Sequence, residues 1–325
     1  MHFHRLKRRE FITLLGGAAI AGWPLDLHAA DQRHIVILHS GFPNRTPIDR
    51  LYNALNERGY RTANIELLGG EGDPDRLKTL IVQIVEQKPD VTIALTSPAA
   101  RGLKQANLSA PVVFVFVADP IEQGIVASLA HPGGNFTGIT YSETAIGSKR
   151  LGIILDVVPS AQRVAVIWGS GLSENVGMVK AIETSAQTRK VSVFSRKVSE
   201  LHDLPSAFDE ASAFGAAALV FLTDNLMFGH RKEVAALALS HHLPSIHAFS
   251  PEVKDGGLLS YGADAEESFQ RAAALVDRIL RGSSPADLPV EEPTRFDLAI
   301  NLKTANALGL TIPPGVLAIA DDVIE

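Results

Sequence analysis

Runs of consecutive apolar residues that stop abruptly at small polar residues constrain the fold of this 325-residue chain most strongly. The clearest run covers residues 217–222 and stops at Thr223, Asp224 and Asn225. An unbroken apolar run between helical patterns is typical of a parallel strand that is buried on both faces. In open α/β sheets, ligands bind beyond the carboxyl ends of such strands. The run therefore predicts a buried strand with a candidate ligand contact, Asp224, at its end, and helix capping is the alternative role for this acid.

Strands and amphipathic helices are expected to alternate along two parts of the chain. In the first part, strands are expected at 35–38, 60–68, 91–95 and 112–117, with helices at 47–58 and 75–87. In the second part, strands are expected at 164–168, 191–194, 217–222 and 244–249, with helices at 175–189, 204–214 and 232–241. This alternation predicts parallel, doubly wound α/β sheets. Equivalent elements recur at an offset of about 130 residues, which predicts two lobes of the same topology.

The remaining segments are expected to connect the lobes. Residues 131–138 are rich in turn residues and are interpreted as a connector between the two lobes. Because both lobes are already complete, the late helix at 268–281 and the strand at 296–301 are expected to cross between them as a hinge that suits closure around a ligand. The predicted division assigns residues 31–139 and about 263–292 to the first lobe. It assigns residues 140–262 and about 293–325 to the second lobe.

Basic residues precede a short apolar stretch at the N-terminus. The stretch at 11–22 is shorter than the roughly 20 residues that a membrane-spanning helix needs. Residues 8–12 resemble a twin-arginine export signal, so residues 1–30 are interpreted as an export signal that is removed from a soluble periplasmic protein. His28 stands where a cut after Ala30 would call for a small residue, and an uncleaved membrane anchor is the alternative.

Composition and missing motifs exclude several kinds of protein. A formal net charge of -6 argues against nucleic-acid binding, which usually requires a basic surface. The absence of cysteine excludes disulfides, thiolate metal sites and a lipid-modified cysteine anchor. No phosphate-binding loop, dinucleotide fingerprint, zinc-protease motif or hydrolase elbow occurs, so neither a cofactor nor a metal is expected. His241, His242 and His247 lack an acidic partner at ligand spacing and are interpreted as helix-end and surface residues.

Polar residues at the strand ends are expected to line one cleft between the lobes. The candidates in the first lobe are His39, Ser40, Thr96, Ser97 and Asp119, and those in the second are Trp168, Gly169, Ser170, Thr223, Asp224, Asn225 and Tyr261. Hydroxyls and helix-start N–H groups favour an anion. Asp119 or Asp224 would suit an ammonium group, and Trp168 or Tyr261 an aromatic body. This inventory predicts a pocket for an amino-acid-like zwitterion. Capping is the alternative role for each residue, and core packing is the alternative for Trp168.

Several segments together resemble one known family. They are 119–120 with 124–129, 131–138, 149–151 with 158–159, 256–262, 285–291, and 301–305 through 309–314. The chain resembles ABC transporter substrate-binding proteins related to tryptophan and tyrosine uptake systems. The resemblance implies a type I periplasmic-binding fold that holds an aromatic amino acid between its lobes. It also implies delivery of the solute to an ABC permease and its ATPase, and ligand contacts at Ser40, Thr96, Ser97, Asp119, Asp224 and Asn225. The missing anchor cysteine is a departure from the founding members.

The leading hypothesis is therefore a monomeric periplasmic solute receptor without a catalytic step. An exported enzyme that uses His39 and Asp119 as acid and base is an alternative from a different class. A sensor module that docks on a membrane kinase is a third alternative, because its cleft would have the same residues.

Overall fold

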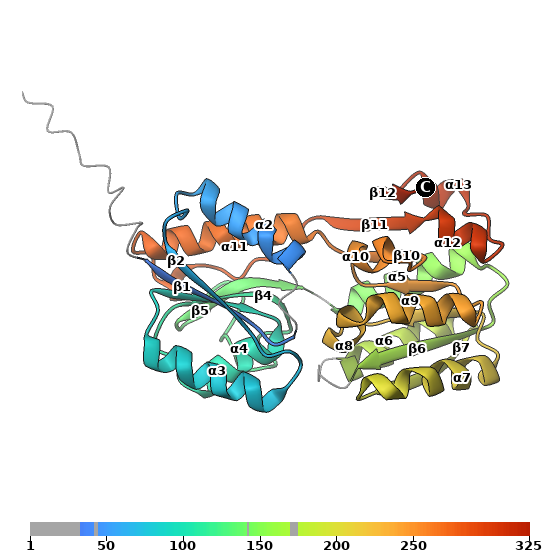
Figure 1. Ribbon diagram of the computed structural model, residues 1–325, viewed down its shortest axis with the longest axis horizontal. Coiled ribbons are helices and arrows are strands. Elements are labelled where there is room, and N and C mark those ends of the chain that lie inside the picture. The colour runs from blue at the N-terminus through green and yellow to red at the C-terminus, as the bar shows by residue number, and fades with distance from the viewer. Residues whose placement is uncertain (1–32, 42–44, 142, 170–174) are drawn as a thin grey trace, which may run out of the picture.

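The computed structural model describes residues 33–41, 45–141, 143–169 and 175–325. They form two α/β lobes that lie side by side (Figure 1). Within these ranges, no helix combines the length and the apolar character that are needed to cross a bilayer. The segment interpreted as an export signal, residues 1–30, lies outside the described residues.

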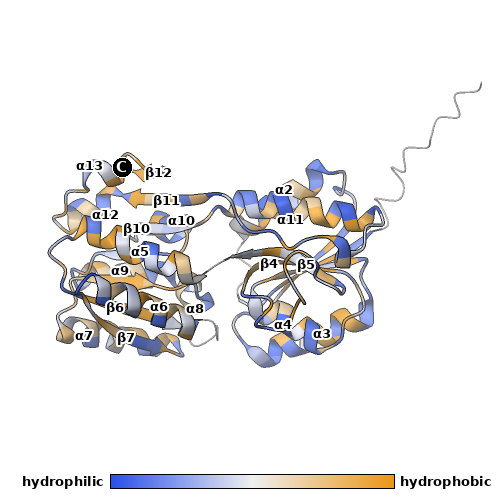
Figure 2. Cartoon of the chain, turned by 180° about the vertical axis from the view of Figure 1, so that it is seen from behind, coloured by the Kyte–Doolittle hydropathy of each residue, from blue (hydrophilic) through white to orange (hydrophobic). Residues whose placement is uncertain are grey.

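The first lobe is built on a five-stranded parallel sheet with the strand order β2-β1-β3-β4-β5. Its strands are β1 (His34–His39), β2 (Asn64–Gly69), β3 (Val91–Leu95), β4 (Val112–Ala118) and β5 (Phe136–Tyr141). Its helices are α2 (Arg45–Glu57), α3 (Pro74–Gln87) and α4 (Ser97–Gln105), together with the late helix α11 (Ala265–Leu280) and the 3-10 turn η2 (Pro285–Asp287). Helices α2, α3 and α11 carry both hydrophobic and hydrophilic residues (Figure 2), as expected for helices that cover a sheet.

The second lobe contains a seven-stranded sheet with the order β12-β11-β10-β9-β8-β6-β7. Its strands are β6 (Arg163–Gly169), β7 (Ser192–Val198), β8 (Ala218–Phe221), β9 (Ser245–His247), β10 (Leu259–Ala263), β11 (Phe296–Asn301) and β12 (Asp322–Ile324). Its helices are α5 (Glu143–Val157), α6 (Asn175–Thr188), η1 (Leu201–Asp203), α7 (Leu204–Phe214), α8 (Asn225–Gly229), α9 (Arg231–Ser240), α10 (Ser250–Lys254), α12 (Leu302–Ala307) and α13 (Pro314–Leu317). Strands β10 and β11 pair antiparallel, whereas the other pairs are parallel. The predicted fold class, two parallel-sheet α/β lobes, is confirmed.

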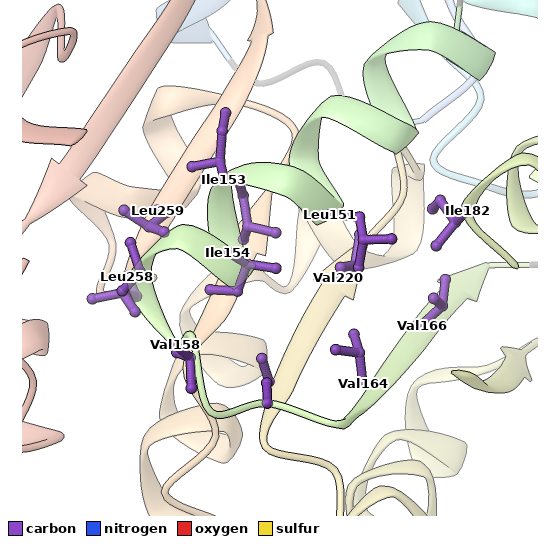
Figure 3. Close-up of a cluster of buried hydrophobic side chains, with 14 of the residues drawn as sticks. Leu151, Ile153, Ile154, Val158, Val164, Val166, Ile182, Val220, Leu258 and Leu259 are labelled. Atoms are coloured by element: carbon purple, nitrogen blue, oxygen red, sulfur yellow. The ribbon is translucent and has the colours of Figure 1, made fainter. Parts of the chain in front are cut away.

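Strand β8 shows why its apolar run does not alternate. Ala218 and Val220 pack in the core on the side of α5 and α6, while Leu219 and Phe221 pack against α7 and α9. All four side chains are fully buried. Figure 3 shows Val220 within the first of these two clusters. A strand that is covered on both faces needs apolar residues at every position, so the run has no period of two.

Strand β5 corrects the interpretation of residues 131–138 as a connector, because residues 136–138 begin the fifth strand of the first sheet. The backbones of β4 and β5 approach closely at Gly138, where a Cβ atom would lie 2.1 Å from the Phe114 carbonyl oxygen. Only glycine fits such an approach. The residue that looks like a turn signal in the sequence is therefore required by strand packing.

The chain passes between the lobes after β5, at 263–265 and at 291–296, as Figure 1 illustrates with α11 beside α2 and β11 extending into the second sheet. Helix α11 buries Phe269, Val276 and neighbouring residues against the first sheet. Ala118 and Ile146 form a small buried cluster with Phe116, Tyr261 and Phe296 where these crossings meet. The junction is thus a packed hinge made of several segments, which suits domain closure.

Candidate functional site

A hydrogen bond joins the two lobes at the ends of their strands. The amide Nδ2 of Asn225, at the start of α8, donates to Ser40 Oγ at 2.9 Å. Ser40 Oγ in turn lies 2.6 Å from Thr96 Oγ1. A Cβ atom on Gly41 would lie only 2.9 Å from Asn225 Cγ, so the backbone after β1 approaches the second lobe closely. The structure therefore brings Ser40, Thr96 and Asn225 together across the cleft.

Thr96 has an unusual backbone for a β-branched residue, with φ 90° and ψ 157°. It is the N-cap residue of α4, but its side chain makes no capping hydrogen bond. Its backbone N–H donates to the Val115 carbonyl oxygen at 2.9 Å, and its hydroxyl is directed to Ser40 instead. Such outliers persist only where the surroundings enforce them, and they cluster at ligand-binding sites.

Two other candidates lie close to the end of β4. Ser97 is buried, and its Oγ accepts hydrogen bonds from Ala118 N and Gln123 Nε2, each at 3.3 Å. The hydroxyl therefore ties the start of α4 to the end of β4. Asp119 follows β4 directly, is exposed, and has φ 43°. Of Ser97 and Asp119, only Asp119 is exposed to solvent.

Asp224 is buried, with 5% of its surface exposed, and is the N-cap residue of α8. Its Oδ1 accepts hydrogen bonds from Leu226 N at 2.7 Å and Met227 N at 3.2 Å, so the capping role is confirmed. Its Oδ2 makes no hydrogen bond to any described residue. Burial raises the pKa of Asp224 to about 6, aided by the Glu252 carboxylate and opposed by the two N–H donors. A buried carboxylate at a strand end, with one oxygen that no described residue donates to, is suited to a cationic ligand group.

Gly169 lies directly against this carboxylate. A Cβ atom there would come within 2.0 Å of Asp224 Oδ2. The buried Asn175 links the two strand ends by donating to the carbonyl oxygens of Thr223 at 3.2 Å and Gly169 at 3.4 Å. Thr223 Oγ1 is buried and has no hydrogen-bond partner among the described residues. Ser170 lies outside the described residues. Asn175 is a supporting residue that the strand-end rule misses, although its position at the first turn of a helix is a recognisable signal.

Three further candidates, Trp168, Tyr261 and His39, make contacts with other residues. Trp168 packs in a hydrophobic core of the second lobe, and its Nε1 donates to Ser195 Oγ at 2.9 Å. The Lys197 ammonium lies 5.8 Å from the centre of the Trp168 ring. These contacts match the core-packing alternative. Tyr261 stacks on Phe296 in the hinge at 5.9 Å. The Nδ1 of His39 accepts from Gly41 N at 2.8 Å, and burial lowers the His39 pKa to about 4, so its ring is neutral near pH 7.

A cavity of about 270 Å³ lies on the hinge side of the junction, and none of the sequence-predicted site residues lines it. Its walls include Arg50 of α2, Phe228 of α8, Phe249 and Lys254, Ala265 of α11 and Asp297 of β11. The Phe249 ring lies 5.8 Å from that of Phe228 and 5.9 Å from that of Phe116 in the first lobe. The strand-end group and the cavity have different lining residues, although Phe228 and Asp224 belong to the same short helix α8 and its cap. The buried Asp224 carboxylate, whose Oδ2 has no hydrogen bond to a described residue, makes the strand-end group the primary candidate.

Comparison with known proteins gives consistent matches. Residues 43–324 match the model of a family described as ABC transporter substrate binding protein. A tyrosine-binding protein of Clostridioides difficile is 26% identical over 261 residues, which cover 79% of this chain and 74% of that protein.

Solved structures share the fold over most of the chain. The ABC domain of Streptococcus pneumoniae in complex with L-Trp is 26% identical with a TM-score of 0.83, covering 90% of this chain and 100% of that one. A conserved domain protein of Vibrio cholerae has the same TM-score and coverage at 24% identity. A solute-binding protein of Agrobacterium vitis with bound allitol, at 18% identity, covers 86% of this chain and 97% of its own with a TM-score of 0.60. These last two show the fold alone.

Proposed function

The chain belongs to the family of ABC transporter substrate-binding proteins, and from this premise we propose that it is a receptor for an amino acid, with an aromatic one favoured. The receptor would pass its solute to an ABC permease and its ATPase. The proposal of an amino acid rests on the buried Asp224 carboxylate, whose Oδ2 accepts no hydrogen bond from a described residue. The similar proteins described as tyrosine-binding and as a complex with L-Trp support an aromatic side chain.

The strand-end group has complementary parts for a zwitterion. Asp224 Oδ2 would accept the ammonium group of the solute. The hydroxyls of Ser40 and Thr96, together with the N–H groups at the start of α4, would receive the carboxylate. The first of these contacts comes from the second lobe and the others come from the first, so the solute would bridge the cleft.

A bridging solute would stabilise the closed arrangement of the lobes. A ligand shifts such an equilibrium by the difference between its affinities for the two states. Asn225 and Ser40 meet across the cleft at 2.9 Å, so the two lobes are already in contact at the strand ends. The permease would then recognise the closed form. The proposed receptor has no catalytic step.

Export is part of the same proposal. The basic N-terminus and the apolar stretch at 11–22 support a signal that delivers the receptor to the periplasm. There it would act as a soluble monomer.

A thermal-shift screen with amino acids, sugars, nucleosides and small carboxylates tests the proposed function. An aromatic amino acid at about 100 times its dissociation constant should add roughly 2.7 kcal/mol to the free energy of unfolding. For a protein of this size, the melting temperature should rise by about 2–4 °C. 3-Phenylpropionate, which lacks the ammonium group, should give a much smaller rise. A shift with a sugar or nucleoside and with no amino acid would contradict the proposal, and chemical conversion of the bound compound would contradict the receptor role.

The affinity for the amino acid should fall in acid. The ammonium group requires ionised Asp224, and the raised pKa of about 6 means that this carboxylate takes up a proton between pH 7 and pH 5. The affinity should therefore be about tenfold lower at pH 5 than at pH 7, as expected for one required ionisation. Isothermal titration calorimetry across this range measures the effect. The Asp224→Asn protein cannot take up this proton, so its residual affinity should change little with pH.

A further inference from the structure

A buried polar network, made of Ser245, His247 and Glu252, lies in the core of the second lobe. Ser245 Oγ is 3.0 Å from His247 Nε2, and His247 Nδ1 faces Glu252 Oε1 at 3.5 Å. All three side chains are almost completely buried. Burying such groups is costly unless they have partners. None of the three belongs to the strand-end group, so another role has to account for them.

The sequence predicts His247 at a helix end or on the surface, and the structure corrects this interpretation. The residue ends β9 and is fully buried, and its ring stacks on Phe221 of β8 with the centroids 4.7 Å apart. A Cβ atom on Gly257 would lie 2.8 Å from the ring, so the imidazole is tightly enclosed. A proton on Nδ1 would face the Glu252 carboxylate and leave Nε2 to accept from the Ser245 hydroxyl. The ring therefore fixes one side of this carboxylate.

The other oxygen of Glu252 holds the backbone that follows β9. Its Oε2 accepts hydrogen bonds from Ala248 N at 3.1 Å and Phe249 N at 2.8 Å. The ladder between β9 and β10 ends at the pair of His247 and Ser260, so these two N–H groups lie just beyond it. The carboxylate takes the place of a neighbouring strand there. The path of the chain after β9, and with it the position of Phe249, therefore depends on the reach of the Glu252 side chain.

The Phe249 ring lies at the junction of the lobes. It makes edge-to-face contacts with Phe228 of the second lobe at 5.8 Å and with Phe116 of the first lobe at 5.9 Å. Phe116 lies on the bulge of β4, where its φ is 58°, and its ring also packs edge-to-face on Phe269 of α11 at 5.5 Å. These four rings run from one lobe to the other. Because an aromatic pair contributes more than its buried area, the contact between Phe249 and Phe116 favours the arrangement in which the lobes meet.

We infer that the buried polar network is a positioning unit, which holds the Phe249 ring against Phe116 and thereby strengthens closure around an aromatic solute. The inference rests on the proposed function, because it concerns closure around that same solute. Glu252 would act through Phe249 and would not contact the solute. The length of its side chain should matter more than its charge, because both N–H groups have to be reached at once.

Two substitutions of Glu252 separate reach from charge. Glu252→Asp keeps the charge but shortens the side chain by one methylene, so it cannot receive both N–H groups in the same way. Its affinity for L-tryptophan, measured by isothermal titration calorimetry, should be about tenfold weaker than that of the wild type, the upper range for one aromatic pair. Glu252→Gln keeps the length and an oxygen acceptor, and it should bind almost as tightly as the wild type.

A second substitution shows whether Glu252 acts through the ring. Phe249→Leu alone should weaken L-tryptophan binding by about tenfold, because the contact with Phe116 is lost. Adding Glu252→Asp should then cause little further loss, since changes that act through one shared contact are not additive. In the free protein, Glu252→Asp should also speed hydrogen exchange at the amides of Ala248 and Phe249.

Asp203→Ala is the matched control in the same lobe. Asp203 Oδ2 also accepts from two backbone N–H groups, those of Ser199 and Glu200, each at 3.1 Å. Its loss should leave the affinity for L-tryptophan unchanged. Wild-type affinity or unchanged amide exchange in Glu252→Asp, or an equal loss in the Phe249→Leu background, would overturn the positioning role. A wild type that binds no amino acid would instead contradict the proposed function, whereas the exchange measurement tests the network in either case.

Discussion

Replacing Gly169 with alanine is expected to weaken amino-acid binding by about a hundredfold. The new methyl group would lie 2.0 Å from Asp224 Oδ2 and 2.1 Å from Asp224 Cγ, so the carboxylate has to move. Two backbone N–H groups hold this carboxylate, and a charge-assisted hydrogen bond contributes about 1.5–3 kcal/mol. The loss of one of these hydrogen bonds, together with the displacement of the carboxylate from the position in which it would accept the ammonium group, accounts for the expected change. Calorimetry with the amino acid identified by thermal shift measures it.

Gly177→Ala is the matched control in the same lobe. Gly177 lies in α6, and a Cβ atom there would meet nothing within 4 Å. Because alanine is the better helix former, this change should stabilise the fold by about 0.5–1 kcal/mol and leave the affinity unchanged. Wild-type affinity in the Gly169→Ala protein would show that the position of Asp224 does not matter for binding.

Asp224→Asn is expected to reduce affinity for an amine-bearing solute by about 30-fold to several thousandfold, which corresponds to the 2–5 kcal/mol typical of a truncated buried charge pair. Asparagine keeps an oxygen for the N–H groups of Leu226 and Met227, so the cap of α8 should remain. The charge is what the change removes. Calorimetry on the folded variant reports the loss, and circular dichroism confirms the fold.

Asp73→Asn controls for capping. Asp73 caps α3 in the same way, with Oδ1 accepting from Asp75 N at 2.8 Å and Arg76 N at 3.3 Å, but it is exposed and belongs to the first lobe. Both asparagine variants should fold, and only Asp224→Asn should lose the solute. Equal affinities for the wild type and Asp224→Asn would leave Asp224 with a capping role alone.

Burial of strands on both faces explains how much of the fold the sequence predicts. Continuous apolar runs such as that in β8 identify the central strands because they have no polar face. The start of strand β5 was interpreted as a connector because Gly138 resembles a turn residue in the sequence. In the structure, Gly138 is needed because the backbone of β4 lies too close for a Cβ atom. The bulge between Val115 and Val117, where Phe116 has φ 58°, was also hidden within an apolar run.

The candidate site was predictable by position rather than by side-chain direction. The strand-end rule selects Ser40 and Asp224 because strand ends are the positions closest to the cleft. It also selects Trp168, whose side chain instead enters the core, since either face of a doubly covered strand accepts an aromatic ring. Capping and ligand binding use the same position after a strand, so the sequence does not separate the two roles of Asp224.

The repeated passage of the chain across the hinge also determines the order in which the lobes can be completed during synthesis. The first sheet is complete once residue 141 has left the ribosome, but α11, which covers one of its faces, is made more than a hundred residues later. Until then, Ile35, Ile93 and Val115 on that face lack the cover that Phe269 and Val276 provide. A truncated chain that ends within the second lobe would keep this face open to chaperones and proteases. The N-terminal lobe is therefore the first to be started and cannot be finished until the second is nearly complete.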